Sequence, residues 1–326
     1  MGTATRVPQR EEAADPTAGL EMEGEELSAE EALAALRRYG GWSLVRDSFV
    51  RFRYADGFSH SRALALQTVL ALVPLAIAVI GLSGALHTED IGRIAELTIR
   101  RLASGPSQEV VDDALSRSRH RAGDGSQVAL WLGLAFSVVN VTTALCQVER
   151  GANRIYGTER DRPFLSKYAR GLVMSVLAGL PLGLSFAVTV LGAHLSRAVA
   201  EVYHLGPGAV RAWDLLRWPV GVLLAVLATS AVFRLSPRRT QPGYTWLAFG
   251  ATVYLALWLL ATWGLSLYVG AGGSFTTVYG PLSAFVSLLL WSYLTSMALF
   301  LGLAFAAQLE AVRAGVTEPA TDDPGV

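Results

Sequence analysis

Long runs of apolar residues alternate with shorter polar stretches along most of this chain. Six runs stand out, and they cover residues 63–86, 128–146, 171–195, 216–233, 245–269 and 279–307. A helix of about 20 apolar residues, rising 1.5 Å per residue, crosses a hydrocarbon layer of roughly 30 Å. The pattern therefore predicts an all-α fold, a polytopic membrane bundle of six transmembrane helices. The fourth run gives the weakest signal, because its strictly apolar part, 220–233, is short.

Apolar residues at helical spacing also precede the first run. Trp42, Val45, Phe49 and Phe52 recur every three or four residues, and the neighbouring arginines face other directions. This spacing predicts a short amphipathic helix within a cytoplasmic or interfacial segment, residues 29–62. Two interpretations are open: the helix packs on the end of the bundle, or it lies on the membrane surface.

The remaining segments complete the predicted domain organisation. Residues 1–28 form an acidic, polar stretch that is expected to be a disordered cytoplasmic tail, and residues 311–326 a flexible one. The transmembrane domain is expected to span 63–310. In the long connection 87–127, apolar spacing predicts two further short amphipathic helices.

The distribution of cations predicts the orientation. The chain is 52% hydrophobic and 17% charged, and its 27 Lys and Arg balance its 27 Asp and Glu. If the N-terminus is inside, segments on the inner side hold 18 of the cations and those on the outer side hold 9. By the positive-inside rule, this bias predicts a multi-pass protein of the plasma membrane with both termini cytoplasmic. No basic domain suited to nucleic acid is present.

The second run carries a polar stripe, which we define as Asn140, Thr143, Gln147, Arg150 and Arg154. These residues follow one another at steps of three or four, so on a continuous helix they share one face. One interpretation is the wall of a hydrated cavity with a cationic mouth, suited to an anionic headgroup or solute. The other is hydrogen bonding between helices together with cationic anchoring at the membrane surface.

Other polar residues in the apolar runs are candidates to line the same interior. They are Gln67 in the first run and Ser283 with Ser287 in the sixth. Gly179 and Gly183 in the third run form a pair of small residues four apart, which predicts close packing against a neighbouring helix.

Signals of enzyme chemistry are weak in this sequence. The five histidines are dispersed, the chain has one cysteine, and neither a zinc-protease motif nor a phosphate-binding glycine loop occurs. We therefore expect no catalytic residues, no cofactor and no metal site.

Three groups of residues, in order along the chain, resemble the YihY/BrkB family of bacterial inner-membrane proteins. The groups are Ala63, Leu64, Ala65, Thr68, Leu72, Val73 and Pro74; then Asn153 to Gly157 with Arg162, Pro163 and Phe164; and finally Tyr279 to Leu282 with Leu290, Trp291 and Tyr293. The resemblance covers about residues 42–310. It implies six spans with cytoplasmic termini, and membership of a group discussed as virulence factors, envelope-integrity proteins or transporters.

The chain departs from that family near the end of the last run. Where the family usually has Leu-Gly-Ala-Glu, this sequence has Leu301, Gly302, Leu303 and Ala304, and Glu310 follows too late to take the same place. A mechanism that needs this carboxylate, such as proton coupling, is therefore not expected. An old family label, ribonuclease BN, finds no supporting metal or acid–base constellation.

These observations leave three hypotheses for function. The first is transport or flipping of an amphiphilic or anionic envelope component, with membrane lipids as partners. The second is a scaffold that transports nothing and maintains envelope integrity. The third is a membrane-bound hydrolase, and none of the three involves nucleic acid as a partner.

Overall fold

A computed structural model describes residues 28–85, 125–158, 162–186, 188, 207–271, 280–316 and 318–319. Over these residues the secondary structure is entirely helical, which confirms the predicted all-α class. The helices are α1 (Ala29–Tyr39), α2 (Gly41–Tyr54), α3 (Gly57–Ala85), α6 (Gly125–Ile155), α7 (Phe164–Phe186), α9 (Pro207–Leu235), α10 (Tyr244–Ala271), the short 3₁₀ helix η2 (Gly280–Leu282) and α12 (Ser283–Arg313).

Five of these helices are long and apolar enough to cross a membrane. The qualifying segments are Trp131–Ile155, Phe164–Ser185, Arg211–Leu235, Tyr244–Val269 and Phe285–Arg313. Helix α3 covers the first apolar run with 29 residues. The predicted class, a membrane protein with several helical spans, is therefore confirmed, while the count of six spans stays a prediction. The fourth run, the weakest in sequence, lies in α9, a helix of 29 residues.

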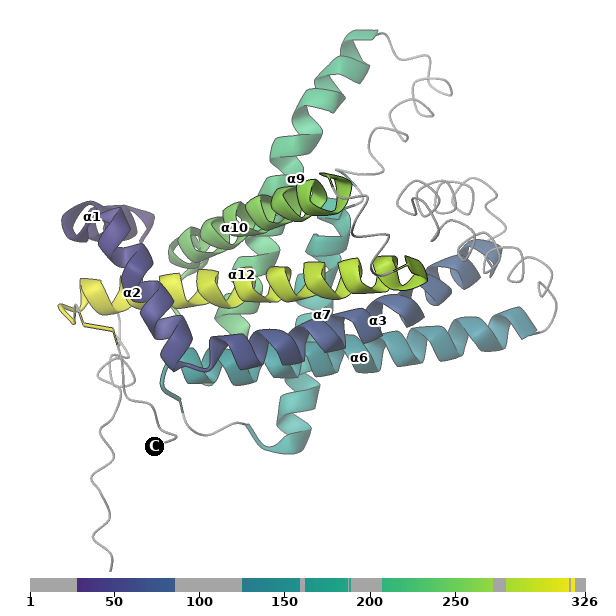
Figure 1. Ribbon diagram of the computed structural model, residues 1–326, viewed down its shortest axis with the longest axis horizontal. Helices are drawn as coiled ribbons and strands as arrows, with labels where there is room; N and C mark the ends of the chain where they lie inside the picture. Colours follow the sequence, from purple (N-terminus) through teal and green to yellow (C-terminus); the bar gives the residue numbers. More distant parts are fainter. Residues whose placement is uncertain are drawn as a thin grey trace, which may run out of the picture.

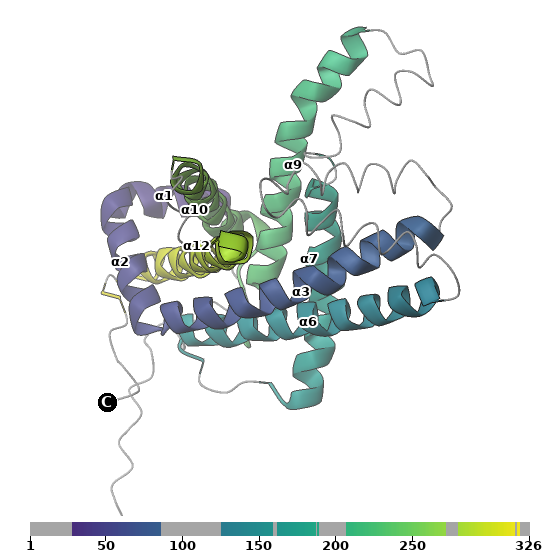
Figure 2. The same ribbon diagram turned by 45° about the vertical axis from the view of Figure 1, so that its right-hand side comes forward.

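Two groups of long helices make up the structure. In the first group, α3 is packed on α6 and on α12, and α10 is packed on α12. Helices α3 and α6 lie side by side, and α10 and α12 run at an angle to them, seen nearly end-on in Figure 2 (Figures 1 and 2). Helices α7 and α9 pack on each other as the second group and cross α3 and α6 steeply in both views. Contacts of α7 with α6 and of α9 with α10 join the two groups.

Helices α1 and α2 gather at the end of the bundle where α12 finishes (Figure 1). Ser28 and Glu31 form a capping box that starts α1, since each side chain accepts a hydrogen bond from the other residue's backbone N–H. Gly40, with φ +91°, permits the sharp turn into α2. Asp56, with φ +54°, lies between α2 and α3.

The tightest core lies at this same end. It brings together Leu44 and Phe52 of α2, Phe233 of α9, Trp246 of α10 and Phe300 of α12, all fully buried. Along the rest of the long helices, many large apolar side chains are exposed. So many exposed apolar side chains are unsuited to water and are expected of helices that face lipid.

Glycines set the closest helix crossing. A Cβ atom placed on Gly250 of α10 would lie 2.6 Å from the carbonyl oxygen of Gly302 on α12, and one on Gly302 would lie 2.6 Å from the carbonyl oxygen of Gly250. Only glycine allows the two backbones to approach so closely. The predicted packing role of Gly179 and Gly183 was wrong, because both are exposed and a Cβ on either would meet nothing within 4 Å.

Several expectations concern residues outside those that the structure describes. They are the acidic tail up to residue 27, the two short helices expected within 87–127, and the tail beyond residue 319. The division into segments 29–62, 63–310 and 311–326 stays a prediction.

The Gly250–Gly302 crossing gives a test of the fold. We expect Gly250→Ala to destabilise the protein by about 1–3 kcal/mol, because the new methyl group would force α10 and α12 apart. Thermal unfolding of the detergent-purified protein measures this. Gly179→Ala is the matched control and should leave the midpoint unchanged, since its methyl group would enter open space. Equal midpoints for the two variants would contradict the close crossing.

Candidate functional site

The polar stripe lies on one continuous helix, α6, as its spacing predicts. Asn140 and Thr143 are partly exposed near the middle of the span. The Asn140 amide donates to the Phe136 carbonyl and the Thr143 hydroxyl to the Val139 carbonyl, each at 2.7 Å. These two bonds remain within α6 and do not tie it to another helix.

The next residue of the stripe, Gln147, turns inward instead. It is buried, and its Nε2 lies 3.0 Å from Nδ1 of His60 on α3. One turn further, the Arg150 side chain is exposed, and Arg154 lies 3.8 Å from the Asp56 carboxylate. The stripe therefore contains a half-exposed part, a buried bond between helices and a cationic end.

The contact between His60 and Gln147 fixes the register of α3 and α6, which run in opposite directions. Seven residues along each helix from this contact lie Gln67 and Asn140, so the two are level near the middle of the span. Within the part of the chain that the structure describes, the Gln67 side-chain oxygen is buried and accepts no hydrogen bond. This register is therefore consistent with the expectation that Gln67 lines the same interior as Asn140.

Ser283 and Ser287 lie further away. Helix α12 approaches α3 at Phe300, whose ring is 6.1 Å from that of His60. Ser287 and Ser283 come 13 and 17 residues before Phe300, so at 1.5 Å per residue they lie roughly 20 Å and 26 Å along α12 from this contact. The structure does not bring these serines together with the stripe.

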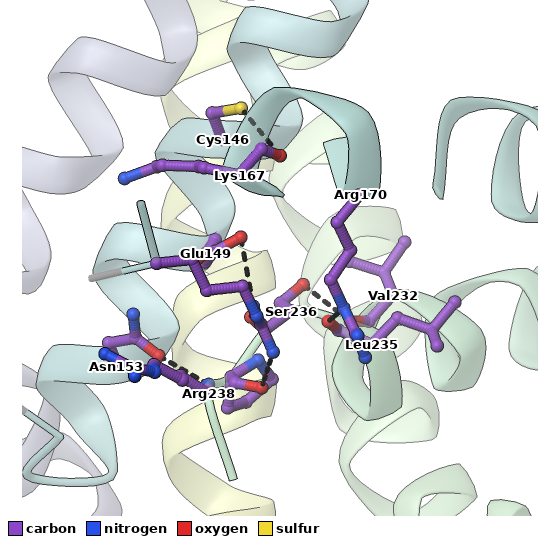
Figure 3. A network of polar contacts seen from close by, with 11 residues as sticks. Cys146, Glu149, Asn153, Lys167, Arg170, Val232, Leu235, Ser236 and Arg238 are labelled. Atoms are coloured by element: carbon purple, nitrogen blue, oxygen red, sulfur yellow. Dashed lines mark hydrogen bonds and ion pairs between the residues drawn. The ribbon is translucent and has the colours of Figure 1, made fainter. Parts of the chain in front are cut away.

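A polar network that sequence reasoning missed joins α6 and α7 to the connection between α9 and α10 (Figure 3). The Glu149 carboxylate is buried and lies 3.1 Å from the Arg162 guanidinium. Arg162 also donates to the carbonyl oxygens of Ser236, at 3.0 Å, and Pro237, at 2.8 Å. This first network holds the connection against α6.

Two more residues complete the first network. Arg170 of α7 donates to the Leu235 carbonyl at 3.0 Å, and the Asn153 side-chain oxygen accepts the Arg238 backbone N–H at 2.7 Å (Figure 3). The last carbonyls of a helix have no partner within the helix and carry its negative dipole end. Arginines are therefore well suited to cap the end of α9.

A second network lies beside the first, at the end of α12. Arg239 pairs with the Glu310 carboxylate, and both side chains are buried. Its guanidinium also lies 4.7 Å from the centre of the Tyr156 ring. Burial raises the pKa of the Tyr156 phenol, so this side chain stays neutral.

Arg51 of α2 extends the second network. It is buried and donates to the Gln308 side chain and to the Ile155 carbonyl, each at 3.0 Å. The second network therefore connects α2, α6 and α12 with the α9–α10 connection. The one sequence signal for either network was charge close to the ends of apolar runs, where buried charges are costly unless paired.

The fold and these networks define an integral membrane protein with several helical spans. The chain belongs to the family described as virulence factor BrkB, which it matches over residues 48–324. This confirms the resemblance seen in the sequence.

Individual relatives are more distant. The chain is 28% identical to the UPF0761 membrane protein RC1_0578 of Rhodospirillum centenum, over 89% of this chain and 63% of that protein. It is 28% identical to the UPF0761 membrane protein Smlt0865 of Stenotrophomonas maltophilia, over 82% of this chain and 62% of that protein. The chain thus spans somewhat less than two thirds of the length of these two relatives.

A third relative is closer in length. The chain is 20% identical to the ribonuclease-like protein YfkH of Bacillus subtilis, over 80% of this chain and 92% of that protein. No solved structure matches the chain.

The Arg239–Glu310 pair yields a second prediction. We expect Arg239→Ala to lower stability by about 3–5 kcal/mol, because it leaves the Glu310 carboxylate buried without its cation. The double variant Arg239→Met, Glu310→Leu should recover much of that loss, since it removes both charges.

Thermal unfolding in detergent measures both effects. Arg211→Ala, which truncates an exposed arginine at the start of α9, is the control and should unfold like the parent protein. If the single variant also unfolds like the parent, the pair contributes nothing measurable.

Proposed function

We propose that this protein moves an anionic amphiphile of the cell envelope across the membrane, along the surface where α3 and α6 meet. The substrate class is a lipid or lipid-like molecule with an anionic headgroup. The plasma membrane is the proposed location, with both termini in the cytoplasm, as the distribution of cations predicts. On this proposal the protein is a transporter and performs no catalysis.

One observation carries the proposal: Gln67 of α3 and Asn140 of α6 lie at the same depth, near the middle of the span. A buried amide oxygen without a hydrogen-bond donor is costly, and in proteins such groups are commonly met by ordered water. The Gln67 oxygen is in this state among the described residues, and the half-exposed Asn140 lies at the same depth. This arrangement supports access of water or a polar headgroup to the middle of the span.

The end of the stripe supports the anionic character of the substrate. Arg150 and Arg154 are exposed or partly exposed on the face of α6 that carries Asn140 and Thr143. Lysine and arginine side chains near a membrane surface attract anionic headgroups. A headgroup that leaves the polar middle of α6 would therefore meet cations at this end.

A scaffold without transport activity is the second candidate. The direct bond between Gln147 and His60, together with the two networks, favours it, because these contacts tie helices together directly. Such bonds are what a passive bundle needs. The two candidate functions make different demands on Gln67 and Asn140. Transport requires polar side chains at these positions, whereas a scaffold does not.

Hydrolysis of a phosphodiester, which the name of the Bacillus subtilis relative suggests, has little support. A hydrolytic nuclease needs metal ligands or an acid and a base that converge on the substrate. In the described ranges, no group of three or more His, Cys, Asp or Glu side chains is placed to hold a metal ion.

Lipid transport in vesicles tests the proposal. The protein is reconstituted with a trace of fluorescent phosphatidylglycerol, and dithionite added outside reports how fast the inner label becomes accessible. Vesicles with the protein should lose all fluorescence, whereas empty vesicles should keep the inner half. We expect Asn140→Leu to slow the movement about tenfold, equivalent to roughly 1.4 kcal/mol in the barrier. Gln67→Leu should act in the same direction.

The controls separate transport from abundance and folding. Arg211→Ala, far from the stripe, should move the lipid at the parent rate, and reconstituted amounts should match in all samples. Arg150→Ala should slow anionic lipid more than neutral lipid. If the parent protein behaves like empty vesicles toward both lipids, the scaffold is the better account.

A further inference from the structure

Helix α2 has two different faces. One is buried in the tight core and against α12, and it consists of Leu44, Ser48, Arg51 and Phe52. Arg51 fastens this face through its bonds to Gln308 and to the Ile155 carbonyl. The orientation of α2 about its own axis is therefore fixed.

The opposite face is exposed and carries large apolar side chains. Trp42 is 82% exposed, Val45 48% and Phe49 47%. Arg46 and Arg53 are exposed on the same face, because residues 42, 46, 49 and 53 follow one another at steps of four, three and four. The expectation that the arginines face other directions was therefore wrong for these two. We call Trp42, Val45, Arg46, Phe49 and Arg53 the outer stripe of α2.

The position of α2 places this helix close to the level of the membrane surface. Only Ala55 and Asp56 separate α2 from α3, which enters the first apolar run. Figures 1 and 2 show α2 lying across the ends of α3 and α12, at the end of the bundle where the buried networks lie. A helix that lies across the ends of spanning helices runs roughly along the membrane surface.

The residues of the outer stripe fit the headgroup layer of a bilayer. Tryptophan prefers the interface between headgroups and acyl chains, and arginines on the same helix pair with lipid phosphates. The stripe contains no acidic residue. The one carboxylate of α2, Asp47, lies off the stripe and accepts a hydrogen bond of 2.8 Å from the Tyr39 hydroxyl.

We propose that the outer stripe of α2 is a binding surface for anionic phospholipid headgroups at this end of the bundle. Val45 and Phe49 enter the acyl boundary, and Arg46 and Arg53 contact the phosphates. This role does not depend on transport, because a scaffold with the same helix would bind the same lipids. The alternative of an amphipathic helix that only packs on the bundle leaves five exposed side chains of this kind unexplained.

Site-directed spin labelling tests the surface directly. Cys146 is the chain's only cysteine, so Cys146→Ala gives a background without thiols. In that background, Val45→Cys and Phe49→Cys each receive a nitroxide, with Ser43→Cys as the matched control on an exposed part of α2 outside the outer stripe. The full chain is studied in vesicles with phosphatidylglycerol and in vesicles of phosphatidylcholine alone.

We expect oxygen, which concentrates in the acyl region, to reach the labels at 45 and 49 several-fold more effectively than a water-soluble nickel reagent does. The label at 43 should show the reverse preference. With phosphatidylglycerol the difference should grow, and Arg46→Gln with Arg53→Gln should abolish that growth. Two label positions keep the test valid if one variant does not fold.

Three outcomes would overturn the proposal. Labels at 45 and 49 that match the label at 43 would place the stripe in water. Labels shielded from both reagents would show that a protein or a second copy of the chain covers it. An oxygen preference that is the same in both kinds of vesicle would leave apolar contact without recognition of anionic headgroups.

Discussion

Arg162 reaches from the α6–α7 connection to the carbonyls of Ser236 and Pro237, and the polar end of the bundle depends on this contact. The same guanidinium pairs with the buried Glu149 carboxylate. Moving such charges out of water costs several kcal/mol each, and this cost is offset only when every charge finds good partners. The α9–α10 connection supplies these partners as backbone carbonyls and as Arg239, so its conformation and the positions of the buried charges determine one another.

The helices also have a means of association that uses no charge. Lipid tails are as apolar as leucine, so burial of apolar surface does little to hold spans together within the bilayer. Close backbone packing replaces it where Gly250 meets Gly302. The structure thus joins its helices through buried charges and, at the crossing of Gly250 and Gly302 beside Phe233, through small residues.

The sequence was sufficient for the class of fold and for the face that the stripe occupies. Apolar length predicts spans whatever their neighbours are, and a periodicity of three and four places Asn140 to Arg154 along one side of α6. The sequence was not sufficient to predict which residues contact one another across neighbouring helices. Gln147 meets His60 because α3 and α6 are antiparallel neighbours in one register, and that register is a tertiary property. His60 had been counted among dispersed histidines for this reason.

The predictions that were wrong or incomplete also concern contacts between helices. Gly179 and Gly183 have the spacing of a packing motif, but the motif acts only where another helix arrives, and no atom lies within 4 Å of a Cβ built on either glycine. Arg238 and Arg239 count among the 18 inner cations that predict the orientation, and in the structure one joins the first network and the other the second. Glu310 was noted as too late for the family's acidic position, and its pairing with Arg239 could not be foreseen from spacing.

The two networks also bear on how a substrate could move. A rocking motion of α7 and α9 against the other long helices would have to break the buried ion pair between Arg162 and Glu149 of α6, whereas the bond from Arg170 to the Leu235 carbonyl joins α7 to α9 and would move with them. Breaking one buried ion pair alone costs about 3–5 kcal/mol, which few ligands recover through their difference in affinity for two states. The polar residues Gln67 and Asn140 lie instead on the α3–α6 pair, which the contact between His60 and Gln147 joins. For the proposed transport, movement of a headgroup along the surface of α3 and α6, with its acyl chains left in the bilayer, therefore fits these contacts better than alternating exposure of a closed site.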